Sequence, residues 1–378
     1  MDARGARREP TMRDVAALAK VSTKTVSRVI NDLPGAGPEV VERVRAAART
    51  LGYRPNLSAS SLRRSDRRSA TIGVLLEDLS NPFDSALLRA VEDLARKNDV
   101  LVLAGSSEDD TDLQRELLTS LATRRVDGMV VMAAGGHQDA LQQERERGMR
   151  MVLVDRPPTF QSTDSVTTTN RDSSREAVLQ LAGLGHQRIA FLGDRQTLWT
   201  SQERYTGYLE GLAHAGLTLR EELVHIDLHG PDAAETATAS LFDLDEPPTA
   251  LFTAQNLVTV GAMRSLRDRG LHRRVALIGF DDFPLADMLE PGVTVLRQDV
   301  PALGRKAAEL IFDRIKGDQS PPTHAVIPAT LVRRGSGEIP PPSRQDGSSS
   351  DTRERPTALT EGAARDQRRL DKNGIGRA

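Results

Sequence analysis

Residues 11–31 read TMRDVAALAKVSTKTVSRVIN, and this stretch decides the fold of the N-terminal part of the chain. Thr11 is suited to be the N-cap of a first helix, and Asp14, three residues later, completes a capping-box pattern. A tight turn at Lys20 and Val21 leads to Ser22, which is a strong N-cap for a second helix. Two short helices joined by so tight a turn are typical of a helix-turn-helix unit.

The second helix is expected to have one apolar and one polar side. Val26, Val29 and Ile30 face a small core, which a third helix from Pro38 to Gly52 closes. The opposite side carries groups that can all hydrogen-bond, two of them cationic: Thr23, Lys24, Ser27, Arg28 and Asn31. Such a face fits the major groove of DNA, where Arg and Lys pair with guanine and Asn with adenine. The alternative is a generic three-helix bundle with a solvated polar face.

Charge is distributed unevenly along the chain. Residues 1–69 contain 15 Lys and Arg against 7 Asp and Glu, whereas the remaining residues contain 36 against 46. A basic head on an acidic body predicts that the head binds a polyanion and the body does not.

Composition excludes several classes of protein. The chain has no cysteine, which excludes disulfides, Cys-ligated zinc, iron–sulfur clusters and a thiol nucleophile, and fits a cytoplasmic location. The sequence has no apolar run of about 18 residues, so no membrane span is expected. The basic N-terminus lacks the apolar stretch of a secretory signal.

From residue 71 onward, short apolar runs alternate with amphipathic stretches. The strand candidates are TIGVLL (71–76), VLVLAG (100–105), GMVVMA (128–133), MVLVD (151–155), RIAFLG (188–193), ALFTA (250–254) and VALIGF (275–280). Apolar strands separated by helices predict an α/β fold with doubly wound parallel sheets, covered on both faces. The array spans about 260 residues, more than one such sheet usually needs, so we expect two similar lobes with a cleft between them.

The patterns divide the chain into five parts. We expect an arm over 1–10, a helix-turn-helix domain over 11–55, a hinge and linker over 56–69, a two-lobed body over 70–335, and a Pro/Ser/Arg-rich disordered tail over 336–378.

The sequence resembles the lactose-repressor-type (LacI/GalR) transcription regulators. The resemblance is carried by the helix-turn-helix stretch, by LGYRPN (51–56) and SLR (61–63), and then by SNPF (80–83), RRVDG (124–128), LVDRP (153–157), LGHQRIAFLG (184–193), RYTGY (204–208), IGFDD (278–282) and VLRQD (295–299). It covers about residues 11–335. One departure in the head is Lys20, where Gly is usual.

The resemblance implies that the head works as a homodimer on near-palindromic double-stranded DNA. It assigns base reading to Thr23, Lys24 and Arg28. It assigns contacts that position the head on the DNA backbone to Ser22, Thr25, Ser27, Asn31, Tyr53 and Asn56. The hinge, residues 56–62 with Ala59 within it, is implied to fold only when paired on DNA. Leu62 matches a leucine wedged into the minor groove, which kinks the duplex; the alternative is an ordinary buried linker leucine.

For the body, the resemblance implies a periplasmic sugar-binding fold that closes around a small effector. The chain is expected to cross between lobes near 169–172, 297–300 and 327–330. This gives an N-lobe of about 70–169 and 299–327 and a C-lobe of about 170–298 and 328–335. The implied effector residues are Phe83, Asp84, Asp155, Trp199, Thr200, Arg204, Gln255, Asp281 and Gln298. Carboxylates and a fork-shaped guanidinium suit vicinal hydroxyls, so a sugar is the expected effector.

Two departures from the family fall in this expected pocket. Asp84 stands where a second aromatic residue is usual after SNPF, and Gln255-Asn256 replaces the usual Asn-Asp pair. They place a negative charge near the ligand, so the sugar of a relative cannot be copied onto this chain. A nucleobase is the alternative effector, which Asp84 disfavours.

Other functions are expected to be absent. The chain has no phosphate-binding, dinucleotide-binding or nucleophile-elbow motif, so neither an enzyme nor a cofactor is expected. The seven histidines show no metal-ligand spacing. A transport-type solute-binding protein is disfavoured by the basic head. The tail lacks a leucine heptad, so a dimer is expected, and repression is the commonest action in the resembled family.

Overall fold

The computed structural model describes residues 10–31, 33–53 and 69–342. The expected hinge lies outside the described residues, as do the arm up to residue 9 and the chain beyond residue 342.

The head is the expected bundle of three helices, α1 (Met12–Ala19), α2 (Thr23–Ile30) and α3 (Pro38–Leu51). Val15, Val26 and Val44 are fully buried at its centre, and partly buried apolar residues surround them. Each helix is too short to be stable alone, so this shared core is what holds the three together.

The predicted ends of these helices are confirmed. The Asp14 carboxylate accepts hydrogen bonds from the Thr11 backbone N–H and hydroxyl, both at 2.7 Å. The Ser22 hydroxyl accepts the Thr25 N–H at 3.1 Å, which caps α2. Helix α3 begins with Pro38 and ends at Gly52, whose φ of 65° lies in the left-handed region. Lys20 ends α1 in the same region, with a φ of 53°, where glycine is the residue without steric cost.

The body contains two six-stranded sheets, and the α/β expectation is confirmed. The N-lobe sheet has the order β11-β5-β4-β3-β1-β2 and the C-lobe sheet the order β12-β10-β9-β8-β6-β7. N-lobe elements are β1 (Thr71–Leu76), α5 (Pro82–Lys97), β2 (Leu101–Ser106), α6 (Thr111–Thr123), β3 (Met129–Val131), α7 (Asp139–Glu146), β4 (Met151–Val154), β5 (Asp164–Thr168), α12 (Val300–Lys316) and β11 (His324–Ile327). C-lobe elements are α8 (Asn170–Gly183), β6 (Ile189–Leu192), α9 (Trp199–His214), η1 (Glu221–Leu223), β7 (Val224–His225), α10 (Pro231–Leu241), β8 (Ala250–Thr253), α11 (Asn256–Asp268), β9 (Ala276–Phe280), β10 (Thr294–Arg297), β12 (Thr330–Val332) and η2 (Ser336–Glu338).

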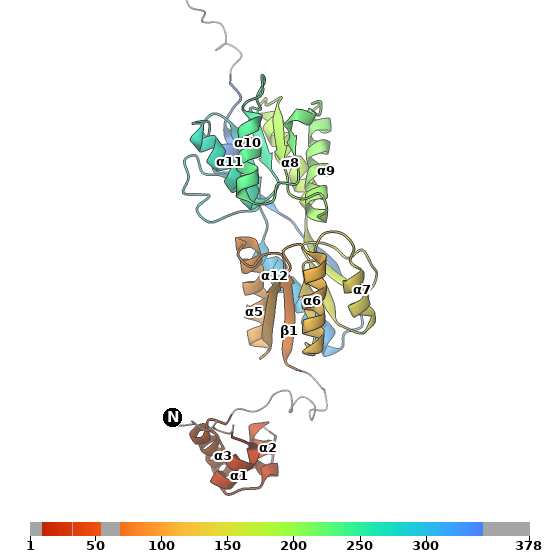
Figure 1. The fold of residues 1–378 in the computed structure, drawn as a ribbon, viewed down its shortest axis with the longest axis vertical. Coiled ribbons are helices and arrows are strands. Elements are labelled where there is room, and N and C mark those ends of the chain that lie inside the picture. The colour runs from red at the N-terminus through yellow and green to blue at the C-terminus, as the bar shows by residue number, and fades with distance from the viewer. Residues whose placement is uncertain (1–9, 32, 54–68, 343–378) are drawn as a thin grey trace, which may run out of the picture. The chain divides into compact units, whose positions relative to one another are not determined.

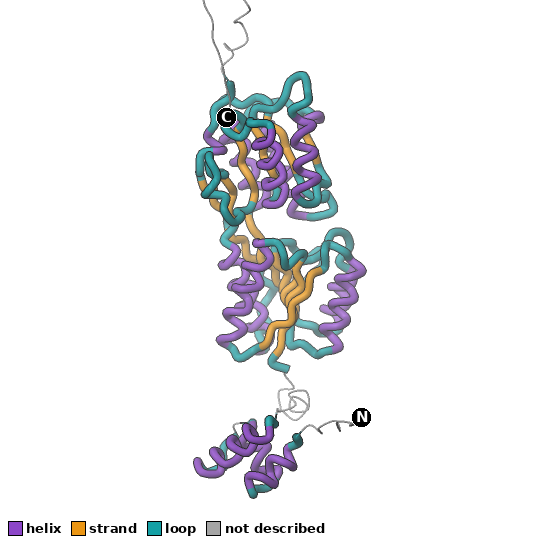
Figure 2. The backbone as a smooth tube through the Cα atoms, turned by 60° about the vertical axis from the view of Figure 1, so that its left-hand side comes forward, coloured by secondary structure: helices purple, strands orange, loops and turns teal. Residues whose placement is uncertain are grey.

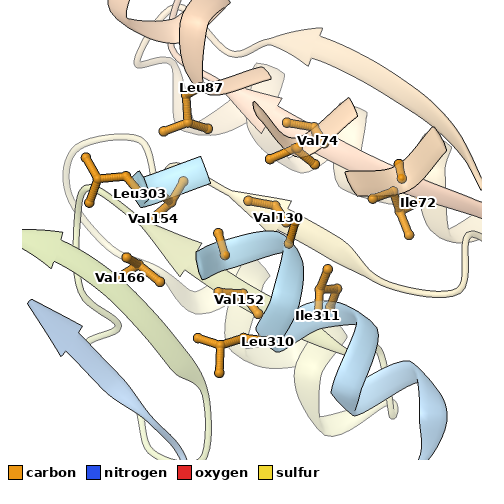
Figure 3. Close-up of a cluster of buried hydrophobic side chains, with 14 of the residues drawn as sticks. Ile72, Val74, Leu87, Val130, Val152, Val154, Val166, Leu303, Leu310 and Ile311 are labelled. Carbon is orange, nitrogen blue, oxygen red and sulfur yellow. The ribbon is translucent and has the colours of Figure 1, made fainter. Parts of the chain in front are cut away.

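Alternate residues of each strand face opposite layers of helices. In the N-lobe, Val130 and Val152 lie in the core under α5 and α12, whereas their neighbours Val131 and Leu153 lie in the core under α6 and α7. Figure 3 shows the first of these cores, with Leu310 and other residues of α12 against the sheet. The C-lobe sheet is covered in the same way, by α8 and α9 on one face and by α10 and α11 on the other. Burial on both faces is why β3, β4, β8 and β9, which are buried along their whole length, have no polar alternation.

The chain passes between the lobes three times. The crossings lie between β5 and α8, between β10 and α12, and between β11 and β12. Figure 1 shows that the chain returns to the N-lobe, because α12, in blue, lies beside the orange elements from the start of the body. Figure 2 shows strands that lead up to the crossings from both lobes. The expected crossings near 169–172, 297–300 and 327–330 overlap these connections.

Two details differ from the expectation. The C-lobe sheet is not wholly parallel, because β12 pairs antiparallel with β10 at its edge. The packed chain also continues past residue 335, since Ser336 is buried and its hydroxyl donates to the Leu277 carbonyl at 2.6 Å. The Ile339 carbonyl lies 2.9 Å from His186 Nε2, which ties this segment to the C-lobe. Within the described ranges, no helix is long and apolar enough to cross a bilayer.

Candidate functional site

The first candidate site is the polar face of α2 in the head. Ser22, Thr23 and Lys24 are exposed at its N-terminal end, and Ser27 and Arg28 are half-buried further along. This is the end of a recognition helix that reaches bases in a helix-turn-helix protein.

Several predicted DNA-contacting side chains also have structural roles. The Asn31 amide donates to the Ser27 carbonyl at 2.6 Å, so this asparagine closes the end of α2. The Thr25 hydroxyl lies 2.9 Å from that of Ser22, and Tyr53 packs against the head core. Asn56, Ala59 and Leu62 lie outside the described residues.

The second candidate site is a cavity between the lobes. Its volume is about 40 Å³, which is enough for a few water molecules. Loops that follow strands of both sheets line it, as expected for open α/β sheets. The lining residues are Glu77, Asn81, Phe83, Asp84, Met132, Asp155 and Arg156 of the N-lobe, and Asp194, Leu198, Thr200, Ser201, Arg204, Ala254, Gln255, Asn256, Asp281 and Gln298 of the C-lobe.

Asp155 and Asp281 occupy corresponding positions in the two lobes. Each directly follows a strand, and their φ angles are 68° and 69°. The N–H of Asp155 donates to the Val166 carbonyl and that of Asp281 to the Leu296 carbonyl. Each left-handed residue costs roughly 1–2 kcal/mol, and such strain is concentrated at functional sites.

Arg204 organises the C-lobe side of the cavity. It donates to the Asn170 side-chain oxygen and to the Ala254 carbonyl, both at 2.8 Å, and to Asp281 at 3.3 Å. Its guanidinium carbon lies 3.8 Å from the centre of the Phe280 ring. The Gln298 amide donates to the other Asp281 oxygen at 2.7 Å. Burial raises the pKa of Asp281 even though Arg204 and Gln298 act in the opposite direction.

Arg156 organises the N-lobe side, and sequence reasoning did not assign it a role. Its guanidinium binds Glu77 and Asp109 and donates to the Ala133 carbonyl. Burial raises the pKa of Glu77 to about 8, although Arg156 opposes this shift. The available signal was the LVDRP motif, in which Arg156 follows a predicted site residue.

Asp84 is 2% exposed and lines the cavity. It lies in the first turn of α5, and its carboxylate accepts the Asp78 N–H at 2.7 Å. Burial raises its pKa to about 7. The neighbouring Phe83 lines the cavity as well.

The starts of two helices meet across the lobes. Asn81 caps α5, and its side-chain oxygen accepts a hydrogen bond from the Asn256 amide at 2.8 Å. Gln255 caps α11, because its side-chain oxygen accepts the N–H groups of Leu257 and Val258. Asn256 is 1% exposed, so this contact between the lobes is shielded from water.

Trp199 is the one predicted effector residue that does not line the cavity. It begins α9, and the residues on either side of it, Leu198 and Thr200, take the cavity-facing positions.

Comparisons with known proteins agree with this architecture. Residues 11–56 match the family described as "Bacterial regulatory proteins, lacI family", and residues 178–337 match "Periplasmic binding protein-like domain". The transcriptional regulator GalS of Salmonella typhimurium is 31% identical over 86% of this chain and 96% of its own. The chain belongs to the lacI family of bacterial regulatory proteins.

Other known proteins align over similar lengths. Catabolite control protein A of Priestia megaterium is 30% identical over 80% of this chain and 91% of its own. A solved structure of a CelR–cellobiose complex is 30% identical and covers 87% of this chain and all of that one, with a TM-score of 0.66. The lac repressor dimer bound to operator has the same fold, with a TM-score of 0.78 over 87% of this chain and 99% of that one at 24% identity. This protein is therefore a DNA-binding transcriptional regulator and not an enzyme.

Proposed function

We propose that the protein is a dimeric repressor whose operator affinity is set by a small polyhydroxylated effector between the lobes. The observation that carries the proposal is the capped helix α2, which presents Thr23 and Lys24 to solvent on the same chain as a two-lobed body with a buried polar cavity. Such a pair of sites is what ligand-gated DNA binding requires.

In the proposed complex, Thr23, Lys24 and Arg28 contact base edges in the major groove. Contacts to the DNA backbone come from Ser22, Thr25, Ser27, Asn31, Tyr53 and Asn56. Of the hinge residues, Ala59 also binds DNA, and Leu62 enters the minor groove. One structural neighbour, a lac repressor dimer bound to its operator, supports both the dimer and the DNA target.

The proposed effector site is formed by residues of both lobes. The proposed ligand contacts are Phe83, Asp84, Asp155, Thr200, Arg204, Gln255, Asp281 and Gln298, with Leu198 in place of Trp199 as an apolar surface. Cellobiose in the structure of a relative supports a carbohydrate-like ligand.

A binding selection from random duplexes, followed by fluorescence anisotropy on the enriched sequence, tests the DNA part. We expect a near-palindromic sequence, and Lys24→Ala is expected to weaken its binding by about tenfold or more, as loss of a base contact does. Lys97→Ala, an exposed lysine at the end of α5, is the control and leaves affinity unchanged. If no sequence is enriched, or if both substitutions act alike, α2 is not the reading element.

A further inference from the structure

The lining of the cavity carries more negative than positive groups. Two guanidinium groups, Arg156 and Arg204, face five carboxylates: Glu77, Asp84, Asp155, Asp194 and Asp281. Four of these carboxylates are on residues no more than 6% exposed, so water screens them little. A ligand that enters this cavity meets an electrostatic potential that favours cations.

Both arginines are already bound to protein groups. Arg156 is held by Glu77, by the Ala133 carbonyl and by Asp109, a further acid that is not part of the lining. Arg204 is held by Asn170, Ala254 and Asp281. Arg156 is thus shared among several carboxylates, and within the described residues neither arginine forms an ion pair with Asp84 or Asp194.

Three buried side-chain atoms on lining residues have no hydrogen-bond partner within the described residues; two are acceptors, and the third, Arg156 Nε, is a donor. Asp155 Oδ1 is fully buried and has no hydrogen-bond partner within the described residues, and its nearest guanidinium contact, from Oδ2 to Arg156 Nε, is 3.7 Å long. Gln298 Oε1 is also buried without a partner there, because the amide nitrogen is used on Asp281. A buried acceptor without a donor costs about 1–3 kcal/mol, so these two oxygens call for a ligand that donates.

Burial of the acids supports the same conclusion. The pKa of Glu77 is raised to about 8 and that of Asp84 to about 7, and burial raises the pKa of Asp155 as well. Protonation is one way to remove the excess charge, and a bound cation is the other. A ligand with a positive charge therefore replaces protons when it binds.

The cavity also has the features of a site for a carbon frame. Phe83, Met132, Leu198 and Ala254 provide apolar contact, and Thr200 and Ser201 provide hydroxyl groups. Apolar side chains do not bind a bare metal ion, whereas apolar and hydroxyl side chains together can contact the faces and hydroxyl groups of a sugar ring. We propose that the effector is a polyhydroxylated amine of the amino-sugar class, whose ammonium group the cavity carboxylates select over neutral and anionic sugars. This inference rests on the proposed function, because it names the ligand class of the same cavity.

Thermal-shift and calorimetric titrations of the full-length protein test the inference with matched compounds. The probes are glucosamine, galactosamine and mannosamine, each beside its parent hexose and its N-acetyl form, with glucuronate and glucose 6-phosphate as anions. We expect at least one amine to bind about tenfold or more tightly than both of its neutral counterparts, and the anions not to bind. Its binding is expected to release protons near pH 7 and to weaken as the pH falls.

The substitution Asp84→Asn removes one charge and keeps the shape of the side chain. It is expected to weaken binding of the amine by about tenfold while its effect on the N-acetyl form is small. Asp232→Asn is the matched control, since Asp232 also lies in the first turn of a helix that begins with proline but is exposed on α10. It is expected to leave both affinities unchanged.

Three results would overturn the inference: a parent hexose or an anion that binds as tightly as its amine, no binding by any amine, or binding of Mg²⁺, Ca²⁺ or Zn²⁺ without an amine. The last outcome would assign the charge to a metal instead, for which ligand atoms of Glu77, Asp194 and His229 lie within 4.8 Å of one another. Fluorescence anisotropy on the selected DNA distinguishes failure of the amine proposal from failure of the proposed function. If a neutral or anionic sugar changes operator affinity, the regulator proposal stands and the amine proposal fails.

Discussion

At the scale of single residues, Lys20 adopts a backbone conformation that is energetically unfavourable for any residue with a side chain. It ends α1 with a φ of 53°, and a side chain in this region costs about 1–2 kcal/mol, which glycine avoids. We expect Lys20→Gly to stabilise the head by about 0.5–1 kcal/mol, seen as slower amide hydrogen exchange in α1 and α2. Lys20→Ala keeps the strain and serves as the control; equal effects of both substitutions would show that the backbone angle is not the cause.

Asp84 makes the stability of the body depend on pH. Its folded pKa of about 7 lies above the ordinary value of 3.8, so between these values the folded state holds a proton that the unfolded state has lost. Stability from this group is therefore present at low pH and is lost as the pH rises toward 7. The pKa reflects burial first, and the charges of Asp155, Arg156 and Asp78 act on it as well.

Asp84→Asn removes the loss of stability that ionisation of Asp84 causes as the pH rises, and the asparagine can still accept the hydrogen bond from the Asp78 N–H. Relative to the wild type, the variant is expected to gain about 1–3 kcal/mol in unfolding free energy between about pH 5 and about pH 8. Urea unfolding at several pH values measures the difference. A gain that does not change with pH would mean that Asp84 is ionised throughout.

At the scale of elements, the packing of α8 against α9 depends on two glycines. A Cβ at Gly207 would lie 2.3 Å from the Arg171 carbonyl oxygen, and one at Gly211 would lie 2.6 Å from Val178 Cβ. Because the first contact is with backbone, the helices must separate to admit a methyl group. Gly207→Ala is expected to destabilise the C-lobe by about 1–3 kcal/mol in thermal or urea unfolding.

Gly183, in the last turn of α8, is the matched control. A Cβ there would meet nothing within 4 Å, and the residue is helical. Gly183→Ala is expected to be neutral or to stabilise by up to about 1 kcal/mol, since alanine favours helix. If Gly207→Ala behaves like Gly183→Ala, the helices are not held at this close distance.

The elements that sequence predicted best are those set by local chemistry. The caps at Thr11 and Ser22 depend on neighbours within three residues, and the strands depend on short apolar runs. The contacts of Arg156 with Glu77 and Asp109 join loops far apart in the chain, so spacing could not reveal them. Trp199 does not line the cavity although Leu198 and Thr200 on either side of it do, and the sequence alone does not show which residue begins α9.

The same limit applies to the end of the body. The Ser336 segment is polar and close to prolines, and composition alone favours a tail there. Its order comes from long-range contacts, including the bonds of Ser336 to the Leu277 carbonyl and to the Thr294 N–H.

At the scale of the whole molecule, the proposed regulation works through a change in the position of the lobes. The hydrogen bond from Asn256 to Asn81 joins the lobes at the cavity, away from the three crossings. A buried hydrogen bond of this kind contributes about 0.5–1.5 kcal/mol, so its loss can shift an opening equilibrium by up to about tenfold. Removing this hydrogen bond therefore changes the balance between open and closed lobes without altering the three crossings.

We expect Asn256→Ala to favour open lobes. Because the chain has no cysteine, spin labels can be placed on Arg96→Cys in the N-lobe and Arg264→Cys in the C-lobe, and the distance between them should lengthen or broaden in the variant. Asn98→Ala, which removes an exposed bond to the Leu94 carbonyl at the end of α5, is the control.

If lobe position couples the two sites, the operator and the effector must still change each other's affinity by a common factor, and that factor is expected to shrink in Asn256→Ala. An unchanged label distance together with an unchanged factor would place the coupling elsewhere in the body.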